Sequence, residues 1–462
     1  MSAIYISALH KSSGKTTVTV GLAAALSQHS RTVATFKKGP DYIDPMWLGA
    51  AAGRPCVNLD LHCQDVAEIE ACYAEYAAGA DAVLVEGNKG LFDGVDVEGT
   101  DSNAAVAKML GLPVVLVVDT RGMTRGIAPV IQGYQAFDDD VRIVGVVLNQ
   151  VGGARHEGKL RAALERYTDV PVLGAVGRHP EIAIDERHLG LMPTNECEET
   201  RNIVSRLAQI AESEVDIGRL RAMGAALPNT PPLIANTDAR PKDLRIAIAR
   251  DAAFGFYYPD DLAAFARHGV ELVPFDALHD PALPDADGLL IGGGFPEVKA
   301  AELSGNVSLR ENIRSAIGAG MPVYAECGGL MYLSRALSWR GERHEMVGAI
   351  PGEAVMHDRP VGRGYVRLRC TGAHPWPGVS ETGAIHPAHE FHYASLEGLP
   401  PGLPHAYEMV RGHGLDGIND GLIFGNMVAG FTHLRNVANT PWVGRFVEFV
   451  RSRRSQMMAA GC

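Results

Sequence analysis

The sequence has no long hydrophobic run, no dense block of basic residues and no closely spaced pair of cysteines. No segment reaches the roughly 18 consecutive apolar residues that are typical of a membrane-spanning helix. The first residues form a short apolar segment without the features of a signal peptide, so we expect a cytoplasmic protein with no membrane partner. The formal net charge of −12, without any segment rich in Lys and Arg, argues against nucleic acid as a partner.

Cysteine is scarce, with 7 in 462 residues, and no two cysteines form a C-x-x-C motif. An odd number without that spacing argues against a disulfide framework and against a structural zinc site. Internal repeats of a fixed period and low-complexity segments are missing as well. The chain is too long for one ordinary core, and its 46% apolar and 21% charged residues are typical of a globular protein with two or three domains.

Short apolar segments that end in polar residues alternate with helical stretches in the first half of the chain, at Ile4–Leu9, Ala82–Glu86, Val114–Asp119 and Ile143–Asn149. Continuous apolar segments of this length suit parallel strands buried on both faces, and ligands bind at the C-terminal ends of such strands. A Pro-rich segment, Pro228–Pro241, reads as a linker, after which the alternation starts again. The sequence therefore predicts an α/β protein with two domains, residues 1–235 and 242–462.

A glycine turn stands between the first predicted strand and a helical stretch, and its candidate nucleotide-binding residues are Ser13, Gly14, Lys15, Thr16 and Thr17. In such a loop, backbone N–H groups and the helix N-terminus bind phosphate. Lys15 would neutralise the β- and γ-phosphate oxygens of ATP, and the Thr16 hydroxyl would bind Mg²⁺. The loop departs from a complete P-loop because Leu9 occupies the position of its first glycine. The alternative is an ordinary glycine turn capped by Thr16.

A turn rich in charge follows another strand-like segment at Lys37–Pro45. Two lysines stand there beside Asp41 and Asp44 in a Gly-Pro context. Such a turn would hold Mg²⁺ together with an anionic substrate, and the alternative is a solvated surface turn.

Two further polar residues end predicted strands of the first half. Glu86 is placed where a carboxylate facing a phosphate loop is a natural Mg²⁺ ligand. We therefore predict a metal site formed by Thr16, Glu86 and Asp41. Asn149 ends a later strand, in a position suited to the adenine edge of a nucleotide.

The second half of the chain contains an apolar strand that runs into a lone cysteine and two glycines, at Val323–Leu330. This is the layout of a nucleophile elbow, in which a sharp turn lifts Cys327 off the end of the strand. The glycines leave room for substrate and free backbone N–H groups to bind an oxyanion. His433, in a later Thr-His pair, is the candidate base. A thiol nucleophile together with a phosphate loop suggests a glutaminase coupled to an ATP-using synthetase, whereas a core cysteine is the alternative.

Taken together, these motifs resemble the cobyrinic acid a,c-diamide synthase family over essentially the whole chain. The markers of that family include a Ser-Gly-Lys-Thr-Thr loop, a Gly-Pro-Asp-Tyr-Ile-Asp-Pro turn, a Gly-Gly-Gly-x-Pro-Glu turn and an Ala-Glu-Cys-Gly-Gly-Leu elbow. In this sequence the full set stands at Ser13–Thr17, Lys37–Pro45, Glu86–Gly94, Gly292–Glu297, Ala325–Leu330, Glu390–Tyr393 and Thr432-His433.

The resemblance implies an N-terminal parallel-sheet domain with a P-loop, similar to dethiobiotin synthetase, and a C-terminal flavodoxin-like domain of the class I glutamine amidotransferases. It implies ATP, Mg²⁺ and glutamine. It also implies a cyclic tetrapyrrole substrate whose a and c acetate carboxylates are amidated through an acyl phosphate. A homodimer is a further expectation from the resemblance.

The resemblance also assigns roles within these motifs. The residues expected to orient the substrate, the acyl phosphate or the incoming ammonia are Lys37, Tyr42, Asp44 and Asp93. The backbone N–H groups expected to bind the oxyanion are those of Gly293, Gly294 and Gly328. Many class I amidotransferases have an acid two residues after the histidine, where this chain has Arg435. A catalytic dyad and a triad completed by an acid from elsewhere both stay open.

Two departures from the family pattern leave the identity of the tetrapyrrole open. Asn88-Lys89 replaces a hydrophobic pair, and Lys38 replaces a typically apolar residue, so both changes add positive charge in loops expected to face the tetrapyrrole. The Gly-Asn-Lys-Gly loop is more similar to the siroheme amidase branch, so siroheme or another metal-sirohydrochlorin is the alternative to cobyrinic or hydrogenobyrinic acid. An alternative of another class is a regulatory P-loop ATPase with a degenerate amidotransferase domain, and the presence of Cys327 and His433 argues against it.

Overall fold

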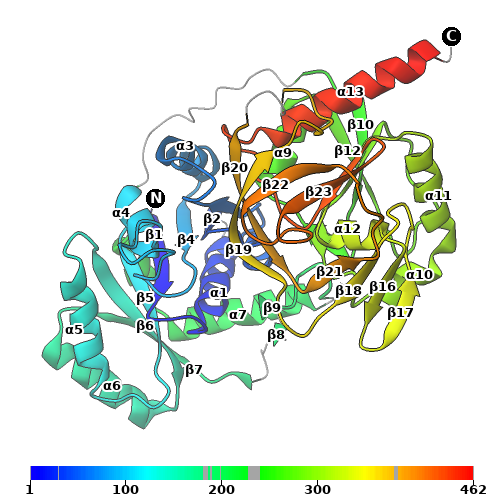
Figure 1. Cartoon of the computed structure of the whole chain (residues 1–462). Coiled ribbons are helices and arrows are strands. Elements are labelled where there is room, and N and C mark those ends of the chain that lie inside the picture. Colours follow the sequence, from blue (N-terminus) through cyan, green and yellow to red (C-terminus); the bar gives the residue numbers. More distant parts are fainter. Residues whose placement is uncertain are drawn as a thin grey trace. The chain divides into compact units, whose positions relative to one another are not determined.

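The computed structural model describes residues 2–29, 31–180, 186–187, 190–197, 199–226, 240–378 and 383–460. The chain folds as two compact units, Met1–Ala235 and Asn236–Cys462 (Figure 1). Most of the predicted linker Pro228–Pro241 lies outside the described residues. Within the described ranges, no helix combines the length and the apolar character needed to cross a membrane.

The first unit is built around a seven-stranded sheet in which every neighbouring pair of strands is parallel. In spatial order its strands are β3 (Val57–Leu59), β2 (Val33–Lys38), β4 (Ala82–Glu86), β1 (Ser2–Ala8), β5 (Val114–Asp119), β6 (Ile143–Val151) and β7 (Val172–Gly177). The helices are α1 (Lys15–Gln28), α2 (Ile43–Ala52), α3 (Val66–Ala77), α4 (Asn103–Met109), α5 (Ile127–Phe137), α6 (Ala154–Tyr167), α7 (Thr200–Glu214) and α8 (Ile217–Ala222). A short antiparallel pair is formed by β8 (Glu186–Arg187) and β9 (Gly190–Leu191).

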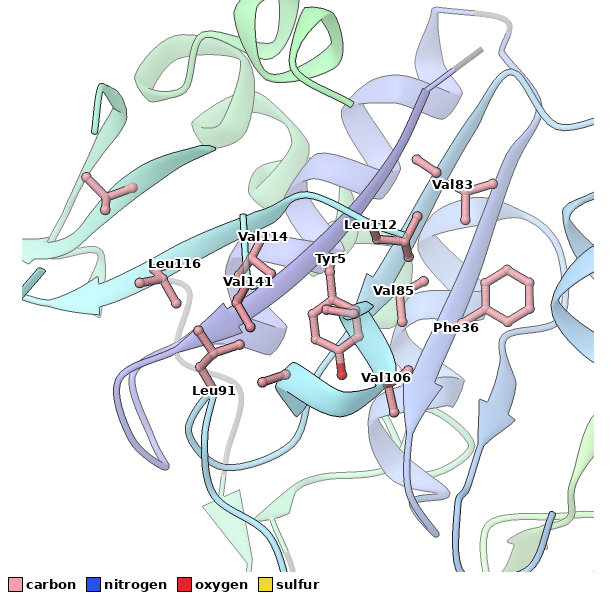
Figure 2. Packing of buried hydrophobic residues seen from close by; sticks show 14 of the residues in the cluster. Tyr5, Phe36, Val83, Val85, Leu91, Val106, Leu112, Val114, Leu116 and Val141 are labelled. Carbon is pink, nitrogen blue, oxygen red and sulfur yellow. The ribbon is translucent and has the colours of Figure 1, made fainter. Parts of the chain in front are cut away.

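Both faces of this sheet are buried, as expected for continuous apolar strands connected by helices. On one face, Tyr5, Val85 and Val114 from neighbouring strands share a hydrophobic cluster with Leu91 and Val106 (Figure 2). The intervening residues of the same strands are buried as well. Helix α1 packs against α7 and α2, which fixes the helix that follows the glycine turn. The predicted parallel α/β sheet is therefore confirmed, although the ends of single strands differ by one or two residues.

The second unit contains a nine-stranded mixed sheet. In spatial order its strands are β12 (Val270–Phe275), β10 (Leu244–Ala249), β13 (Gly288–Ile291), β15 (Val323–Glu326), β24 (Met427–Gly430), β23 (Asn419–Phe424), β22 (His405–Arg411), β19 (Gly362–Cys370) and β20 (Ile385–His392). The strands from β12 to β24 are parallel, and the remaining pairings are antiparallel. The sequence predicted only the parallel half, because strands such as β19 alternate buried and exposed residues and have no continuous apolar segment.

Two smaller sheets and five helices complete the described part of the second unit. A four-stranded sheet contains β17 (Glu342–Glu345), β16 (Ala336–Trp339), β18 (Glu353–Met356) and β21 (Ala394–Glu397), and a two-stranded one contains β11 (Phe254–Phe256) and β14 (Gly293–Gly294). The helices are α9 (Pro259–Arg267), α10 (Ala300–Gly305), α11 (Val307–Gly318), α12 (Gly328–Leu333) and α13 (Trp442–Ala460).

The central parallel strands of this unit separate two hydrophobic clusters. Leu289 and Ile291 of β13 belong to one cluster, whereas Leu290 between them belongs to the other. The same alternation divides Ala325 from Tyr324 in β15. Because both faces of β15 are packed, its C-terminal end is held rigidly at the point where the chain turns into α12.

Candidate nucleotide and glutaminase sites

The glycine turn of the first unit connects β1 to α1 and has a constrained backbone. Gly14 has φ of 82°, in the left-handed region that favours glycine, and Lys15 is the first residue of α1. A Cβ atom at Gly14 would lie 2.1 Å from Nδ2 of Asn149, which itself donates to the Ser13 carbonyl at 2.9 Å. Asn149, near the C-terminal end of β6, thus holds the turn through the Ser13 carbonyl. Its contact with adenine stays a prediction.

The Lys15 side chain is buried and points toward the loop Glu86–Gly94. Its Nζ donates to the Lys89 carbonyl at 2.6 Å. Burial, together with the nearby Lys37 ammonium, lowers the pKa of Lys15 to about 8, although the carboxylates of Glu86 and Asp44 oppose this shift. Because the lowered pKa shows that the positive charge on Lys15 is poorly compensated, an anionic ligand nearby would stabilise the protonated form.

A second buried lysine lies between two carboxylates. Lys37 Nζ donates to Asp44 Oδ2 at 2.5 Å and to Glu86 Oε1 at 2.6 Å. Burial opposes the charge on Lys37, but the two carboxylates hold its pKa well above the usual value. The Thr16 hydroxyl completes the cluster, 3.1 Å from Asp44 Oδ2 and 2.9 Å from Glu86 Oε1. The first turn of α1, the end of β4 and the start of α2 therefore meet at one point.

This cluster fits a Mg²⁺ ion that is shared with phosphate. Glu86 is fully buried, and within the described residues its Oε2 atom has no hydrogen-bond partner. This oxygen, close to the Thr16 hydroxyl, can therefore bind a metal ion. In the described part of the chain, no group of three or more His, Cys, Asp or Glu residues forms a complete metal cage. Mg²⁺ in phosphoryl-transfer sites is usually bound by only one or two carboxylates, together with water and substrate phosphates.

The predicted third ligand, Asp41, is not at the centre of this cluster. Its Oδ1 accepts from the N–H groups of Ile43 and Asp44, both at 3.0 Å, and so caps the start of α2. Its Oδ2 lies 3.9 Å from Lys37 Nζ. The carboxylates that contact the Thr16 hydroxyl are Glu86 and Asp44, and Asp44 was predicted to orient the substrate.

The loop Glu86–Gly94 is held by one buried amide. Asn103 at the start of α4 accepts from the Asn88 N–H at 3.0 Å and donates to the carbonyls of Asn88 and Gly90, both at 2.5 Å. Asp93 is exposed, and its Oδ2 accepts from the Gly90 N–H at 2.9 Å. The predicted substrate residue Tyr42 is half-buried and immediately precedes α2.

Lys38 does not add charge to an exposed loop, contrary to the expectation from the sequence. Its side chain is 2% exposed and its Nζ lies 3.3 Å from Asp101 Oδ2. A buried lysine needs such a partner, because an unpaired charge in the interior is strongly unfavourable. Lys89, by contrast, is exposed.

In the second unit, Cys327 stands between β15 and α12 in a strained conformation. Its φ of 48° is in the left-handed region, which a residue with a side chain adopts only when the surroundings impose it. The Cys327 N–H donates to the Gly430 carbonyl at 2.7 Å. A Cβ atom at Gly329 would lie 2.2 Å from the Ile291 carbonyl oxygen, so only glycine permits α12 to start this close to β13. The geometry matches the predicted nucleophile elbow.

His433 is buried against the elbow. It makes a hydrogen bond with Cys327, and its Nδ1 lies 3.2 Å from Glu326 Oε2. Burial alone would lower the pKa of His433, but the contacts with Cys327 and Glu326 outweigh burial and raise it to about 10. A histidine in this state holds its proton beside the sulfur, as an imidazolium paired with a thiolate does.

The two glycine turns lie beside this pair. Gly328 begins α12, where first-turn N–H groups have no acceptor within the helix. A Cβ atom at Gly328 would lie 3.1 Å from the Gly294 nitrogen, and one at Gly293 would lie 2.8 Å from His433 Cε1. The three glycines predicted to bind the oxyanion are thus brought together around Cys327 and His433.

Comparison with known proteins reveals close relatives along nearly the full chain. The cobyrinate a,c-diamide synthase of Magnetococcus marinus is 46% identical over 461 residues, covering 98% of this chain and 98% of the relative. The chain belongs to the cobyrinate a,c-diamide synthase family. A relative of the same name from Methanosarcina acetivorans is 39% identical and covers 96% of this chain and 94% of its own. One from Synechocystis sp. is 37% identical, with coverages of 93% and 90%.

Two family models match parts of this synthase-family chain. The CobB/CobQ-like glutamine amidotransferase domain matches residues 245–440, which include both Cys327 and His433. An AAA domain matches residues 54–184, which include Glu86 and Asn149 but begin after the glycine turn. The predicted phosphate-binding role of that turn therefore depends on its own sequence and geometry.

Sequence reasoning missed two buried acids that hold the histidine of this family member in place. Glu326 directly precedes Cys327 and contacts His433, which is 107 positions away. Asp420 accepts from the N–H groups of Phe431 and Thr432, both at 3.0 Å, and from the Thr432 hydroxyl. This explains the Thr-His pair, because the threonine anchors the segment that carries the candidate base. The Ala-Glu-Cys order of the elbow was the one available signal for Glu326.

Glu390 and His392, for which the sequence suggested no role, stabilise the local fold. Glu390 accepts from the N–H groups of His413 and Gly414, both at 2.8 Å. His392 stacks on Phe431 with ring centroids 4.1 Å apart. Arg435, where an acid was sought, donates to Asp260 at 2.8 Å.

Proposed function

We propose that this chain is a ligase that uses ATP and glutamine to amidate the a and c acetate carboxylates of a cyclic tetrapyrrole of the cobyrinic acid type. The observation that carries the proposal is the near full-length match to cobyrinate a,c-diamide synthases. The buried phosphate-loop cluster of the first unit and the Cys327–His433 pair of the second supply the two chemistries that such a reaction needs.

The first unit would activate the carboxylate. A carboxylate does not react with ammonia because its oxygen is a poor leaving group. Attack of a carboxylate oxygen on the γ-phosphorus of ATP releases ADP and gives an acyl phosphate, from which ammonia then displaces inorganic phosphate. Lys15 and Lys37 would neutralise charge on the transferring phosphoryl group. Thr16, Glu86 and Asp44 would hold Mg²⁺, which when bound neutralises the phosphate oxygens.

The second unit would supply the ammonia. The Cys327 sulfur attacks the amide carbon of glutamine, while the N–H groups near Gly294 and Gly328 stabilise the oxyanion. His433 gives its proton to the departing ammonia, and a thioester remains. Water then hydrolyses the thioester, which releases glutamate and restores the thiol.

The identity of the Mg²⁺ ligands leads to a prediction. Asp44→Asn should raise the Mg²⁺ concentration for half-maximal binding of a fluorescent ATP analogue by about tenfold, because one of the carboxylates that accompany the Thr16 hydroxyl is lost. Asp41→Asn should leave the Mg²⁺ dependence nearly unchanged, because asparagine still caps α2. Equal shifts in the two variants would contradict this assignment of the ligands.

Siroheme is the less favoured substrate. One of the two departures that suggested it, Lys38, is a buried partner of Asp101 and is not available to a substrate. Lys89 alone does not outweigh near full-length relatives named cobyrinate a,c-diamide synthase. A homodimer and the contacts of Tyr42 and Asp93 with substrate stay predictions.

Release of ADP and glutamate in the presence and absence of cobyrinic acid tests the proposed function. We expect equal amounts of both products, and both should depend on the tetrapyrrole, because phosphorylation and amide formation are steps of one reaction. A regulatory ATPase would release ADP without glutamate. That result would contradict the proposal.

A further inference from the structure

The carboxylate of Glu326 is buried and lies in direct contact with the ring of the candidate base. Glu326 is 7% exposed and is the last residue of β15, immediately before the nucleophile. Its Oε2 lies 3.2 Å from His433 Nδ1. Its Oε1 accepts from the Tyr324 hydroxyl at 2.5 Å and from the Leu434 N–H at 2.9 Å. The carboxylate is thus fixed by two donors while its other oxygen faces the imidazole.

This arrangement fixes the orientation of the histidine ring. With Nδ1 turned to Glu326, the other ring nitrogen, Nε2, is the one that can serve Cys327. A carboxylate on Nδ1 selects the tautomer that carries hydrogen there and stabilises the imidazolium that forms when the thiol loses its proton.

We propose that Glu326 is the positioning acid of the glutaminase site, supplied from the residue before the nucleophile and not from two residues after the histidine. The inference rests on the proposed glutaminase function and completes its catalytic group as Cys327, His433 and Glu326. Glu326 acts through His433 and does not contact the glutamine carbonyl.

Two neighbouring charged groups, Arg435 and Asp420, contact other partners. Arg435, at the position where an acid is common, is a cation that pairs with Asp260. The oxygens of Asp420 accept from Phe431 and Thr432.

His389 stacks on His433 with ring centroids 4.8 Å apart and an interplanar angle of 16°, so it contacts the face of the ring and not its edge. Tyr258 lies behind it, with its hydroxyl 3.4 Å from His389 Nδ1.

The decisive variant is Glu326→Gln, which keeps the size of the side chain and removes its charge. We expect the glutaminase rate to fall by about a hundredfold or more, as is typical when the acid behind a catalytic histidine is neutralised. Amidation driven by free ammonia should keep the rate of the parent chain, because the first unit is untouched. Glu326→Asp, which restores the charge, should recover part of the glutaminase rate.

The pH dependence of Cys327 alkylation by iodoacetamide separates positioning from a structural role. In the parent chain the raised pKa of His433 keeps the imidazolium beside Cys327 at neutral pH, so alkylation should already be fast there. Removing the carboxylate lowers the pKa of His433, so in Glu326→Gln the alkylation rate should rise only at higher pH. Tyr324→Phe, which removes a donor to Oε1 but leaves the charge, should keep the profile of the parent chain.

Two outcomes would overturn the inference. One is a Glu326→Gln protein that keeps both the glutaminase rate and the alkylation profile of the parent chain. The other is an identical shift in Tyr324→Phe and Glu326→Gln, which would indicate packing as the cause. If Glu326→Gln fails to fold, the Glu326→Asp and Tyr324→Phe profiles still decide. Glutamine hydrolysis retained in Cys327→Ala would instead overturn the proposed function itself.

Discussion

Replacing Cys327 with alanine is expected to reduce glutamine-dependent amidation by about 10⁴-fold or more, because no other group can form the thioester. Amidation with free ammonia should continue at the rate of the parent chain, since ammonia bypasses the glutaminase step. The measurement is the rate of tetrapyrrole amidation with each nitrogen source at saturating ATP and Mg²⁺.

A second cysteine offers a matched control for this prediction. Cys370 in β19 is also buried, and burial raises the pKa of its thiol to about 11, as expected for an unreactive core residue. Cys370→Ala should keep both activities, apart from a loss of stability from the small cavity. Glutamine-dependent turnover that survives in Cys327→Ala would refute its role as the nucleophile.

Replacing Lys15 with alanine is expected to abolish amidation from both nitrogen sources, with a loss of about a thousandfold in ADP formation. The reason is that both routes share the acyl phosphate, and Lys15 is the buried cation at the start of α1. The measurement is ammonia-dependent ADP release, together with iodoacetamide labelling to confirm that Cys327 remains reactive.

Lys89→Ala is the matched control for Lys15→Ala. It removes an exposed ammonium but keeps the backbone carbonyl that Lys15 contacts at 2.6 Å. Binding of an ATP analogue should therefore be lost in Lys15→Ala and kept in Lys89→Ala. Normal ammonia-dependent product formation in Lys15→Ala would contradict the proposed role of the glycine turn.

The sequence predicted those parts of the fold in which the apolar pattern of a segment matches its burial in the folded protein. Continuous apolar segments such as Ala82–Glu86 are buried on both faces, and they became parallel strands with unchanged bounds. The antiparallel strands β19, β20, β22 and β23 were not predicted. Buried and exposed residues are mixed along β19 and β22, so neither strand has a continuous apolar segment.

Contacts between distant residues explain what the site prediction missed. Motifs identified the positions of Cys327 and His433, but the acid that contacts His433 is revealed only when β15 and the segment after β24 lie side by side. The sequence alone does not distinguish the roles of the two aspartates in the Gly-Pro turn. The folded start of α2 does so, because Asp41 caps the helix and Asp44 contacts Thr16.

The most direct test of the central claim is mass spectrometry of cobyrinic acid after incubation with this protein, ATP, Mg²⁺ and glutamine, with siroheme offered in parallel. The account predicts two successive conversions of carboxylate to amide on cobyrinic acid, each accompanied by one ADP, because each carboxylate must be phosphorylated before ammonia can attack it. Unchanged cobyrinic acid together with amidated siroheme would contradict the account.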